Sequence, residues 1–88
     1  RSSDLTAFTD AKGALKTHES AVVALESRQE AFNYAKERYA VGMMNSFDFN
    51  QAQTLLTNAQ SEVIRTKYDY IFKIKILEFY FGIPILKN

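Results

Sequence analysis

The stretch RYAVGMMNSFDFNQ, residues 38–51, interrupts a chain whose pattern is otherwise uniformly helical. Gly42 stands where a residue in the left-handed conformation would end one helix. Asn45 is a strong N-cap for the next helix, and Asp48 follows it at capping-box spacing, with Asp in place of the usual Glu. An acidic residue there also complements the helix dipole. The stretch therefore predicts a connection of about four residues, Val41 to Met44, between two helices.

The first run, roughly Leu5 to Tyr39, carries both bulky and small residues at helical spacing. The bulky set is Leu15, Val22 and Gln29 on one heptad position, with His18, Leu25, Phe32 and Tyr39 on its partner. The small set is Ala7, Ala14, Ala21, Ala24, Ala31 and Ala35. Because a surface helix usually has one apolar face, two faces predict a helix with a neighbour on each side. His18, the only histidine, is expected to be a packed or solvated residue of the seam.

The second run, roughly Ser46 to Phe81, follows a strict seven-residue repeat. One heptad position holds Phe49, Leu56, Val63, Tyr70 and Leu77, and the other holds Ala52, Ala59, Thr66, Lys73 and Tyr80. Such a repeat predicts coiled-coil packing with left-handed supercoiling. From Tyr68 onward the run is apolar almost all round, which predicts burial on several sides. Gly82 followed by Pro84 predicts a helix stop.

The first third of this second run has an unusual composition. No residue from Phe49 to Ser61 is charged, and asparagine, glutamine, threonine and serine supply the polarity. Because a solvated helix face normally carries lysine and glutamate, the composition suits two other settings. One is helix–helix packing through side-chain hydrogen bonds, which is the simpler explanation. The other is a position that faces a water-filled lumen.

Together these patterns predict an all-α fold, a long antiparallel helical hairpin of coiled-coil type. We expect a single unit over residues 1–88, with a helix at about 4–40, a tip turn at about 41–45, a second helix at about 46–81 and a tail at 82–88. Two helices alone bury little surface, and the chain has no cysteine to staple them. The hairpin is therefore expected to be a fragment of a longer protein and part of an assembly.

Composition excludes several classes of function. With 11 basic and 10 acidic residues the net charge is +1, which gives no electrostatic footprint for nucleic acid. Without cysteine there is no thiolate metal site, and neither a metal ion nor a cofactor is expected. No nucleophile–base pair, phosphate loop or ligand cluster is present, so an enzyme is not expected. The sequence contains no run of about 18 uncharged apolar residues, so no transmembrane helix is expected.

The tip is apolar where polar residues would be expected. Gly42, Asn45 and Asp48 are explained by a well-formed turn, but Val41, Met43 and Met44 are not. Apolar side chains at an exposed tip indicate contact with another molecule.

The chain resembles the TolC-like outer-membrane efflux protein family, also called outer membrane factors. Tyr39, Gly42, Asn45 and Asp48 match the family spacing Tyr-x-x-Gly-x-x-Ser/Thr-x-x-Asp. The heptad run then continues the match through Ala52, Gln53, Leu56, Ala59, Tyr70, Leu77 and Gly82. The resemblance covers nearly the whole chain and fits the second of the family's two repeats better than the first.

The resemblance implies a trimeric channel of a Gram-negative outer membrane, whose β-barrel continues into a periplasmic α-barrel of paired helices. This segment would lie in the periplasm, and the channel would passively export small molecules or proteins. The tip would dock on a periplasmic adaptor protein and, through it, on an inner-membrane pump. The implied docking residues are Val41, Gly42, Met43, Met44 and Asn45, and a possible gate consists of Tyr39 and Asp48.

Departures from the family pattern limit what carries over. Asn45 replaces the usual Ser or Thr but still caps. Met44 stands where some relatives carry a basic residue and Gln51 where some carry a second acid, so a gate built on those charges is weaker or absent. Tyr39 and Asp48 also have simpler explanations, as a seam tyrosine and a cap carboxylate.

Two other functions stay open at this point. One is the helical hairpin of a periplasmic adaptor protein, but such hairpins usually carry an Arg and a Leu-Ser pair near the tip, where this chain has Met-Met-Asn-Ser. The other is a generic coiled-coil interaction module that needs no membrane.

Overall fold

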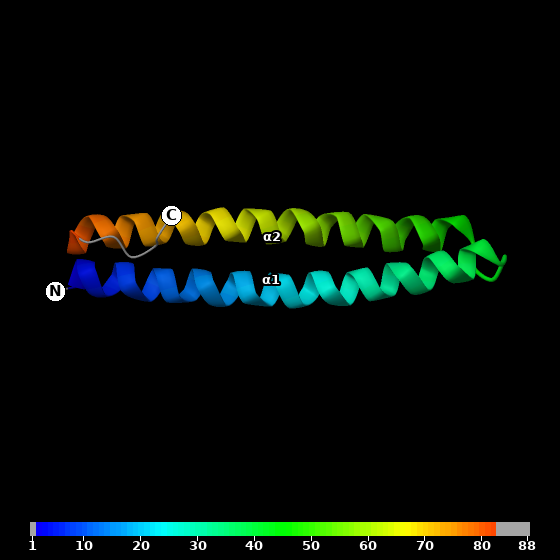
Figure 1. Cartoon of the computed structure of the whole chain (residues 1–88), viewed down its shortest axis with the longest axis horizontal. Coiled ribbons are helices and arrows are strands. Elements are labelled where there is room, and N and C mark those ends of the chain that lie inside the picture. Colours follow the sequence, from blue (N-terminus) through cyan, green and yellow to red (C-terminus); the bar gives the residue numbers. More distant parts are fainter. Residues whose placement is uncertain (1, 83–88) are drawn as a thin grey trace.

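The computed structural model of the chain describes residues 2–82, which form a hairpin of two long antiparallel helices (Figure 1). Helix α1 spans Ser2–Ala40 and helix α2 spans Ser46–Phe81. The long axis of the molecule measures 60 Å. No strand occurs among the described residues. The predicted all-α hairpin is therefore confirmed, whereas the predicted tail beyond Gly82, with Pro84, lies outside the described residues.

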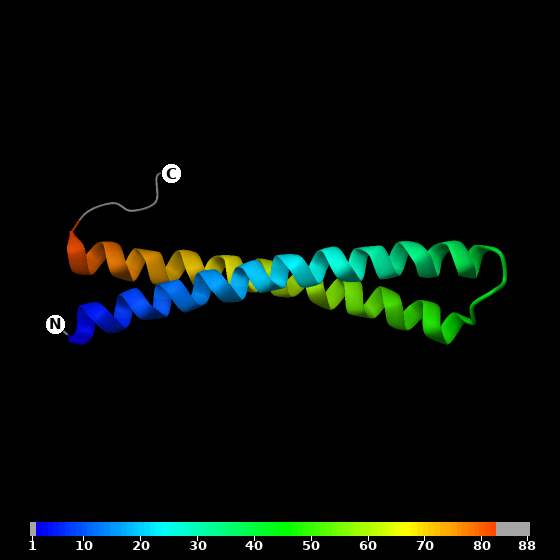
Figure 2. The same ribbon diagram turned by 90° about the horizontal axis from the view of Figure 1, so that it is seen from below.

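The two helices wind around each other. They lie side by side in one view (Figure 1), and α1 passes across α2 near the middle of the hairpin when the molecule is turned (Figure 2). A seven-residue repeat imposes such winding, because an undistorted helix turns every 3.6 residues and its apolar stripe would otherwise drift away from the partner.

The α2 side of the seam follows the predicted heptads. The residues of the repeat that are buried or half-buried are Phe49, Ala52, Leu56, Ala59, Val63, Thr66, Tyr70, Lys73 and Leu77. Tyr80, the last member of the predicted repeat, is exposed. The seam therefore ends about one turn before the helix does, and Gly82 closes α2 in the left-handed conformation with φ +71°.

The α1 side corrects the prediction of separate bulky and small faces. Ala7, Ala14, Ala21 and Ala35 are buried, and they share one face with the half-buried His18, Leu25 and Phe32. The two sets are three or four residues apart, which places them on the same side of a helix. The remaining predicted alanines, Ala24 and Ala31, are exposed on the flank. The buried alanines allow α2 to approach closely, and the assignment of these four to a second face was wrong.

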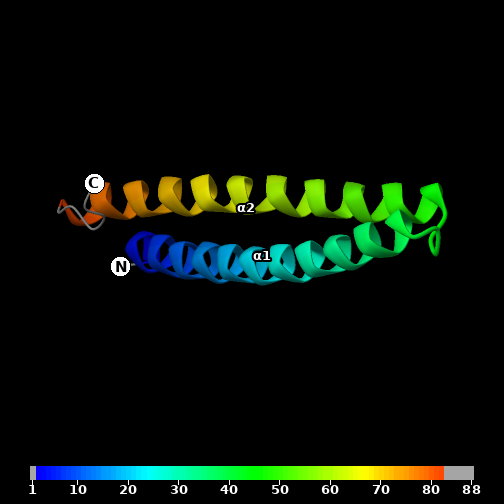
Figure 3. The same cartoon turned by 45° about the vertical axis from the view of Figure 1, so that its right-hand side comes forward.

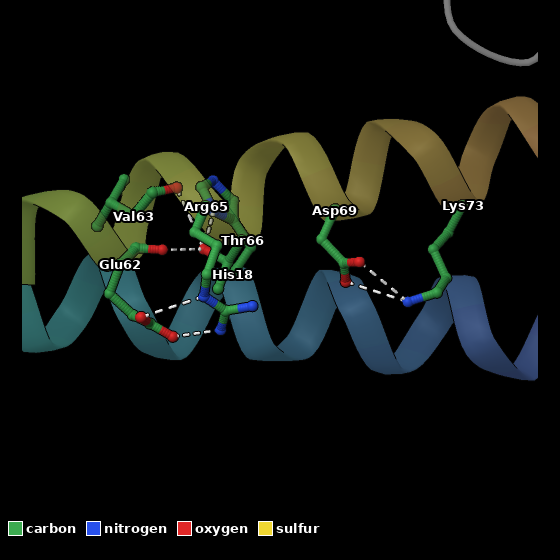
Figure 4. Close-up of polar contacts among 7 residues, drawn as sticks. All are labelled: His18, Glu62, Val63, Arg65, Thr66, Asp69 and Lys73. Atoms are coloured by element: carbon green, nitrogen blue, oxygen red, sulfur yellow. Dashed lines mark hydrogen bonds and ion pairs between the residues drawn. The ribbon is translucent and has the colours of Figure 1, made fainter.

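One side-chain hydrogen bond joins the two helices within the described part of the chain (Figure 4). The Nδ1 atom of His18 lies 3.0 Å from the hydroxyl oxygen of Thr66, which is 2% exposed. The same hydroxyl lies 2.8 Å from the Glu62 carbonyl oxygen, to which it donates. Since a hydroxyl has one proton to donate, the His18 ring donates from Nδ1 and Thr66 accepts. A polar pair in an apolar seam favours one register of the helices.

Other polar contacts lie along the surface of α2 (Figure 4). Arg65 donates to the Glu62 carboxylate, and this hydrogen bond holds the pKa of Glu62 below its ordinary value. Lys73 Nζ lies 3.1 Å from an Asp69 carboxylate oxygen. Both pairs join residues one turn apart on one helix. The Arg65–Glu62 pair is exposed and the Lys73–Asp69 pair is half-buried. Ion pairs between neighbouring turns of one helix add little to stability.

Candidate functional site

The candidate site is the tip, which lies at the end of the hairpin opposite the start of α1 and the end of α2 (Figure 3). Gly42 has φ +79°, as predicted for a helix-ending glycine. Its N–H donates to the Tyr39 carbonyl at 3.1 Å, and the Met43 N–H donates to the Arg38 carbonyl at 2.8 Å. This pair of bonds is a Schellman motif, which satisfies two of the carbonyls that a helix end leaves open.

The first turn of α2 is capped as the sequence predicted. The backbone of Asn45 is extended, with φ −82° and ψ 164°, and its side-chain oxygen accepts from the Asp48 N–H at 2.7 Å. Within the described residues the Asp48 carboxylate makes no return bond to Asn45, so the motif is a single cap rather than a full capping box. The carboxylate is exposed in the first turn, where a negative charge is favourable.

Met44 differs from the other apolar tip residues because it is half-buried. It directly precedes the N-cap, and Phe49 occupies the fourth helical position after that cap. These are the two positions of a hydrophobic staple, in which an apolar pair fixes the angle at which the chain enters a helix. The role of Met44 in docking stays a prediction.

Three aromatic rings join the helices just behind the tip. The rings of Tyr39 and Phe49 are stacked with centroids 4.4 Å apart, and Phe32 lies 5.5 Å from Phe49. Tyr39 therefore has the seam role that was the simpler explanation. Its side chain is still partly exposed, and its hydroxyl makes no hydrogen bond within the described residues. The gating roles of Tyr39 and Asp48 stay predictions.

The exposed apolar surface of the tip consists of Val41, Met43 and Phe47, which are 69%, 63% and 73% exposed. Phe47 was not among the residues predicted for this surface. A signal was available, because residues two apart on a helix lie about 200° apart around its axis. Only one ring of Phe47-Asp48-Phe49 can face α1, and the heptad repeat assigns that place to Phe49.

The tip is also uncharged. None of the residues between Arg38 and Asp48 is acidic or basic, and Arg38 donates to the Tyr34 hydroxyl at 3.0 Å one turn back along α1. Among the described residues no three His, Cys, Asp or Glu side chains gather where they could hold a metal ion. The exposed surface of the tip is therefore apolar and without acidic or basic side chains from Tyr39 to Phe47. Neither α1 nor α2, over the part that the structure describes, is apolar enough along a sufficient length to cross a membrane.

A second uncovered surface runs along α2 on the side opposite the seam, and we call it the outer stripe. Its apolar half consists of Ile64, Tyr68, Phe72 and Phe79, which are all exposed. Its polar half, nearer the tip, consists of Asn50, Thr54, Thr57 and Ser61, also exposed. The burial on several sides predicted for the end of α2 is not found within the hairpin, because α1 covers only one side.

The outer stripe and the apolar tip are thus left uncovered by the hairpin itself. Residues 4–79 match the model of the outer membrane efflux protein family, so the chain belongs to that family. The match includes both helices and the tip, and it confirms the resemblance found from Tyr39, Gly42, Asn45 and Asp48. Members of this family are efflux channels of the outer membrane, a class of transport protein. Comparisons with curated proteins and with solved structures gave no significant match.

Proposed function

We propose that this hairpin is the periplasmic tip segment of a trimeric outer-membrane efflux channel, and that its tip docks on a periplasmic adaptor protein. Through the adaptor the channel is coupled to an inner-membrane pump, and it passively exports small molecules or proteins. The observation that carries this proposal is the exposed, uncharged apolar surface at the far end of a hairpin 60 Å long. An apolar surface at that place has no function in the isolated hairpin, but it suits an end-on contact.

The docking surface is formed by Val41, Gly42, Met43, Met44 and Asn45. Val41 and Met43 supply apolar area, and the backbone of the turn supplies polar groups. Gly42 contributes by being small, since a Cβ atom at this position would meet nothing within 4 Å in the hairpin. Its surroundings are thus open to a partner that approaches the backbone closely.

Tyr39 and Asp48 form the gate in this proposal. The Tyr39 hydroxyl and the Asp48 carboxylate lie on either side of the turn, and neither has a hydrogen-bond partner within the described residues. Stacking on Phe49 holds the Tyr39 ring in place. The Tyr39 hydroxyl and the Asp48 carboxylate, unpartnered in one hairpin, are available to neighbouring hairpins at a constriction.

The outer stripe faces the rest of the assembly. Neighbouring helices cover its apolar half, and its neutral polar half packs against them or borders the water-filled lumen. The segment lies in the periplasm of a Gram-negative bacterium. The family match over both helices favours a channel over the hairpin of an adaptor or a generic coiled-coil module.

The variant Gly42→Asn tests the docking proposal. Asparagine tolerates the left-handed conformation better than other residues with a Cβ atom, so the turn should still form, but the added side chain fills the open space above it. In the intact channel we expect a protein that reaches the outer membrane folded and trimeric but no longer supports efflux. Wild-type drug resistance in this variant would show that Gly42 only ends a helix.

A further inference from the structure

The turn carries both sulfur atoms of the chain, which has two methionines, Met43 and Met44, and no cysteine. The two residues are adjacent, but Met43 is 63% exposed, whereas Met44 is half-buried. The thioether of methionine is a soft, polarizable group that oxidants attack at sulfur. Because a dissolved oxidant must reach the side chain to react with it, the two methionines should react at different rates.

The exposure of Met43 follows from the folded turn. Gly42, with φ +79°, leads the chain out of α1, and the Met43 N–H donates to the Arg38 carbonyl at 2.8 Å. The bonds that end the helix therefore also position the backbone of Met43. Its neighbour Val41 is 69% exposed and does not cover it. An oxidant can thus approach Met43 without any unfolding of the hairpin.

Oxidation would make this apolar part of the tip polar. A hydroperoxide transfers one oxygen atom to the sulfur: the sulfur gives up two electrons, the O–O bond breaks, and hydrogen peroxide leaves as water. The product, methionine sulfoxide, carries a polar S=O group that accepts hydrogen bonds from water. Burial of this group against another protein removes that water, which is unfavourable. A methionine sulfoxide reductase restores the thioether with two electrons and two protons from thiols, and it releases the oxygen as water.

We propose that Met43 is a reversible oxidation site, at which a hydroperoxide lowers the affinity of the tip for the protein that docks on it. The effect on affinity rests on the docking function proposed above, but the selective oxidation of Met43 does not. Met44 carries the same functional group one residue away, so it is an internal control for exposure.

The first experiment follows the oxidation of the purified intact channel by dilute hydrogen peroxide. Tandem mass spectrometry of the peptide that contains both methionines measures the fraction of sulfoxide at each position over time. Circular dichroism and light scattering check that helix content and oligomeric mass are unchanged. We expect Met43 to be oxidised at least about threefold faster than Met44. A smaller ratio would overturn the oxidation site, whether or not the tip docks.

The second experiment measures the Kd of the intact channel for the purified adaptor protein of the same bacterium, before and after peroxide treatment. It compares wild type, Met43→Leu and Met44→Leu, since leucine is apolar and of similar size but has no sulfur. We expect peroxide to raise the Kd at least about threefold in wild type and in Met44→Leu. In Met43→Leu the Kd should change by less than about twofold, whatever the starting affinity of that variant.

The outcomes separate this inference from the docking function itself. If the untreated wild type binds, but oxidation of Met43 leaves its Kd unchanged or Met43→Leu responds to peroxide as wild type does, the switch is wrong while docking stands. If the untreated wild type does not bind, the docking function falls, and the effect of oxidation on affinity falls with it.

A measurement on wild type alone covers the case in which Met43→Leu does not bind. Partly oxidised channel is passed over immobilised adaptor, and the sulfoxide at Met43 and Met44 is measured in the bound and the unbound fractions. We expect the bound fraction to contain less Met43 sulfoxide than the unbound fraction. Equal Met43 sulfoxide in the two fractions would overturn the proposal.

Discussion

The rings of Tyr39 and Phe49 stack with their planes 9° apart, which ties the last turn of α1 to the first turn of α2 directly behind the tip. The Gly42 turn and the Asn45 cap set the path of the backbone, and the stacked rings hold the two helix ends at that spacing. The tip presents Val41, Met43 and Phe47 to solvent.

The first prediction concerns this stacked pair. Phe49→Ala should destabilise the hairpin by about 1–3 kcal/mol, because the variant loses a half-buried ring and the stacking contact of that ring with Tyr39. Phe47→Ala, which removes the same side chain from an exposed position, should change stability by no more than about 0.5 kcal/mol. Urea unfolding of the two variants at equal protein concentration measures the difference. Equal destabilisation would show that Phe49 does not hold the helices together.

The second prediction concerns the bond between the helices. Thr66→Val keeps the shape of a 2% exposed side chain but leaves His18 Nδ1 without its partner, so it should cost about 1–3 kcal/mol. Adding His18→Leu to this variant should recover much of the loss, because both polar groups are then gone. Thermal unfolding of the single and double variants provides the measurement, and strictly additive losses would argue against the bond.

The pairing of His18 with Thr66 shows how far the sequence alone could go. His18 lies 24 residues before Gly42 and Thr66 lies 24 residues after it, so an antiparallel hairpin that turns at Gly42 brings them together. The caps and the α2 heptads could be predicted, because a turn and a strict repeat are local patterns. The face of the buried alanines could not be predicted as easily, since alanine fits a seam and a flank equally well.

Phe47 and Met44 show the limit at the tip. Both are apolar residues beside the turn, so their residue types alone predict the same role for both. The heptad repeat indicates that Phe47 faces away from α1, but the half-burial of Met44 follows only from the path of the turn. The alternative roles of Tyr39 and Asp48 depend on neighbouring hairpins, so the sequence of one hairpin does not decide between them.

The third prediction separates the cap role of Asp48 from gating. Asp48→Asn keeps the backbone N–H at position 48, which donates to the Asn45 side chain, but it removes the negative charge from the first turn of α2. Loss of this charge should cost about 0.3–1 kcal/mol of helix stability. Circular dichroism melting curves of the variant measure this loss. A gating role would be favoured over the cap if the intact channel with this change admitted large antibiotics without any loss of stability.

The fourth prediction is that the isolated chain self-associates through the apolar half of the outer stripe. Four exposed apolar side chains along one side of α2 form an apolar surface whose burial against another molecule is favourable. Phe72→Glu should therefore shift the chain toward monomers, whereas Thr57→Glu, on the polar half of the same stripe, should not. Light scattering at high micromolar concentration measures the mass. A stable folded monomer of the unchanged chain would contradict the prediction.

Site-specific photo-cross-linking tests the central claim, that the apolar tip docks on an adaptor, most directly. A photoreactive residue is placed at Met43 in the intact channel, and the purified adaptor protein of the same bacterium is added before illumination. Val23, equally exposed in the middle of α1, is the matched control position. We predict a channel–adaptor product from position 43 and little or none from position 23. Equal products from both positions, or none from position 43, would contradict the account.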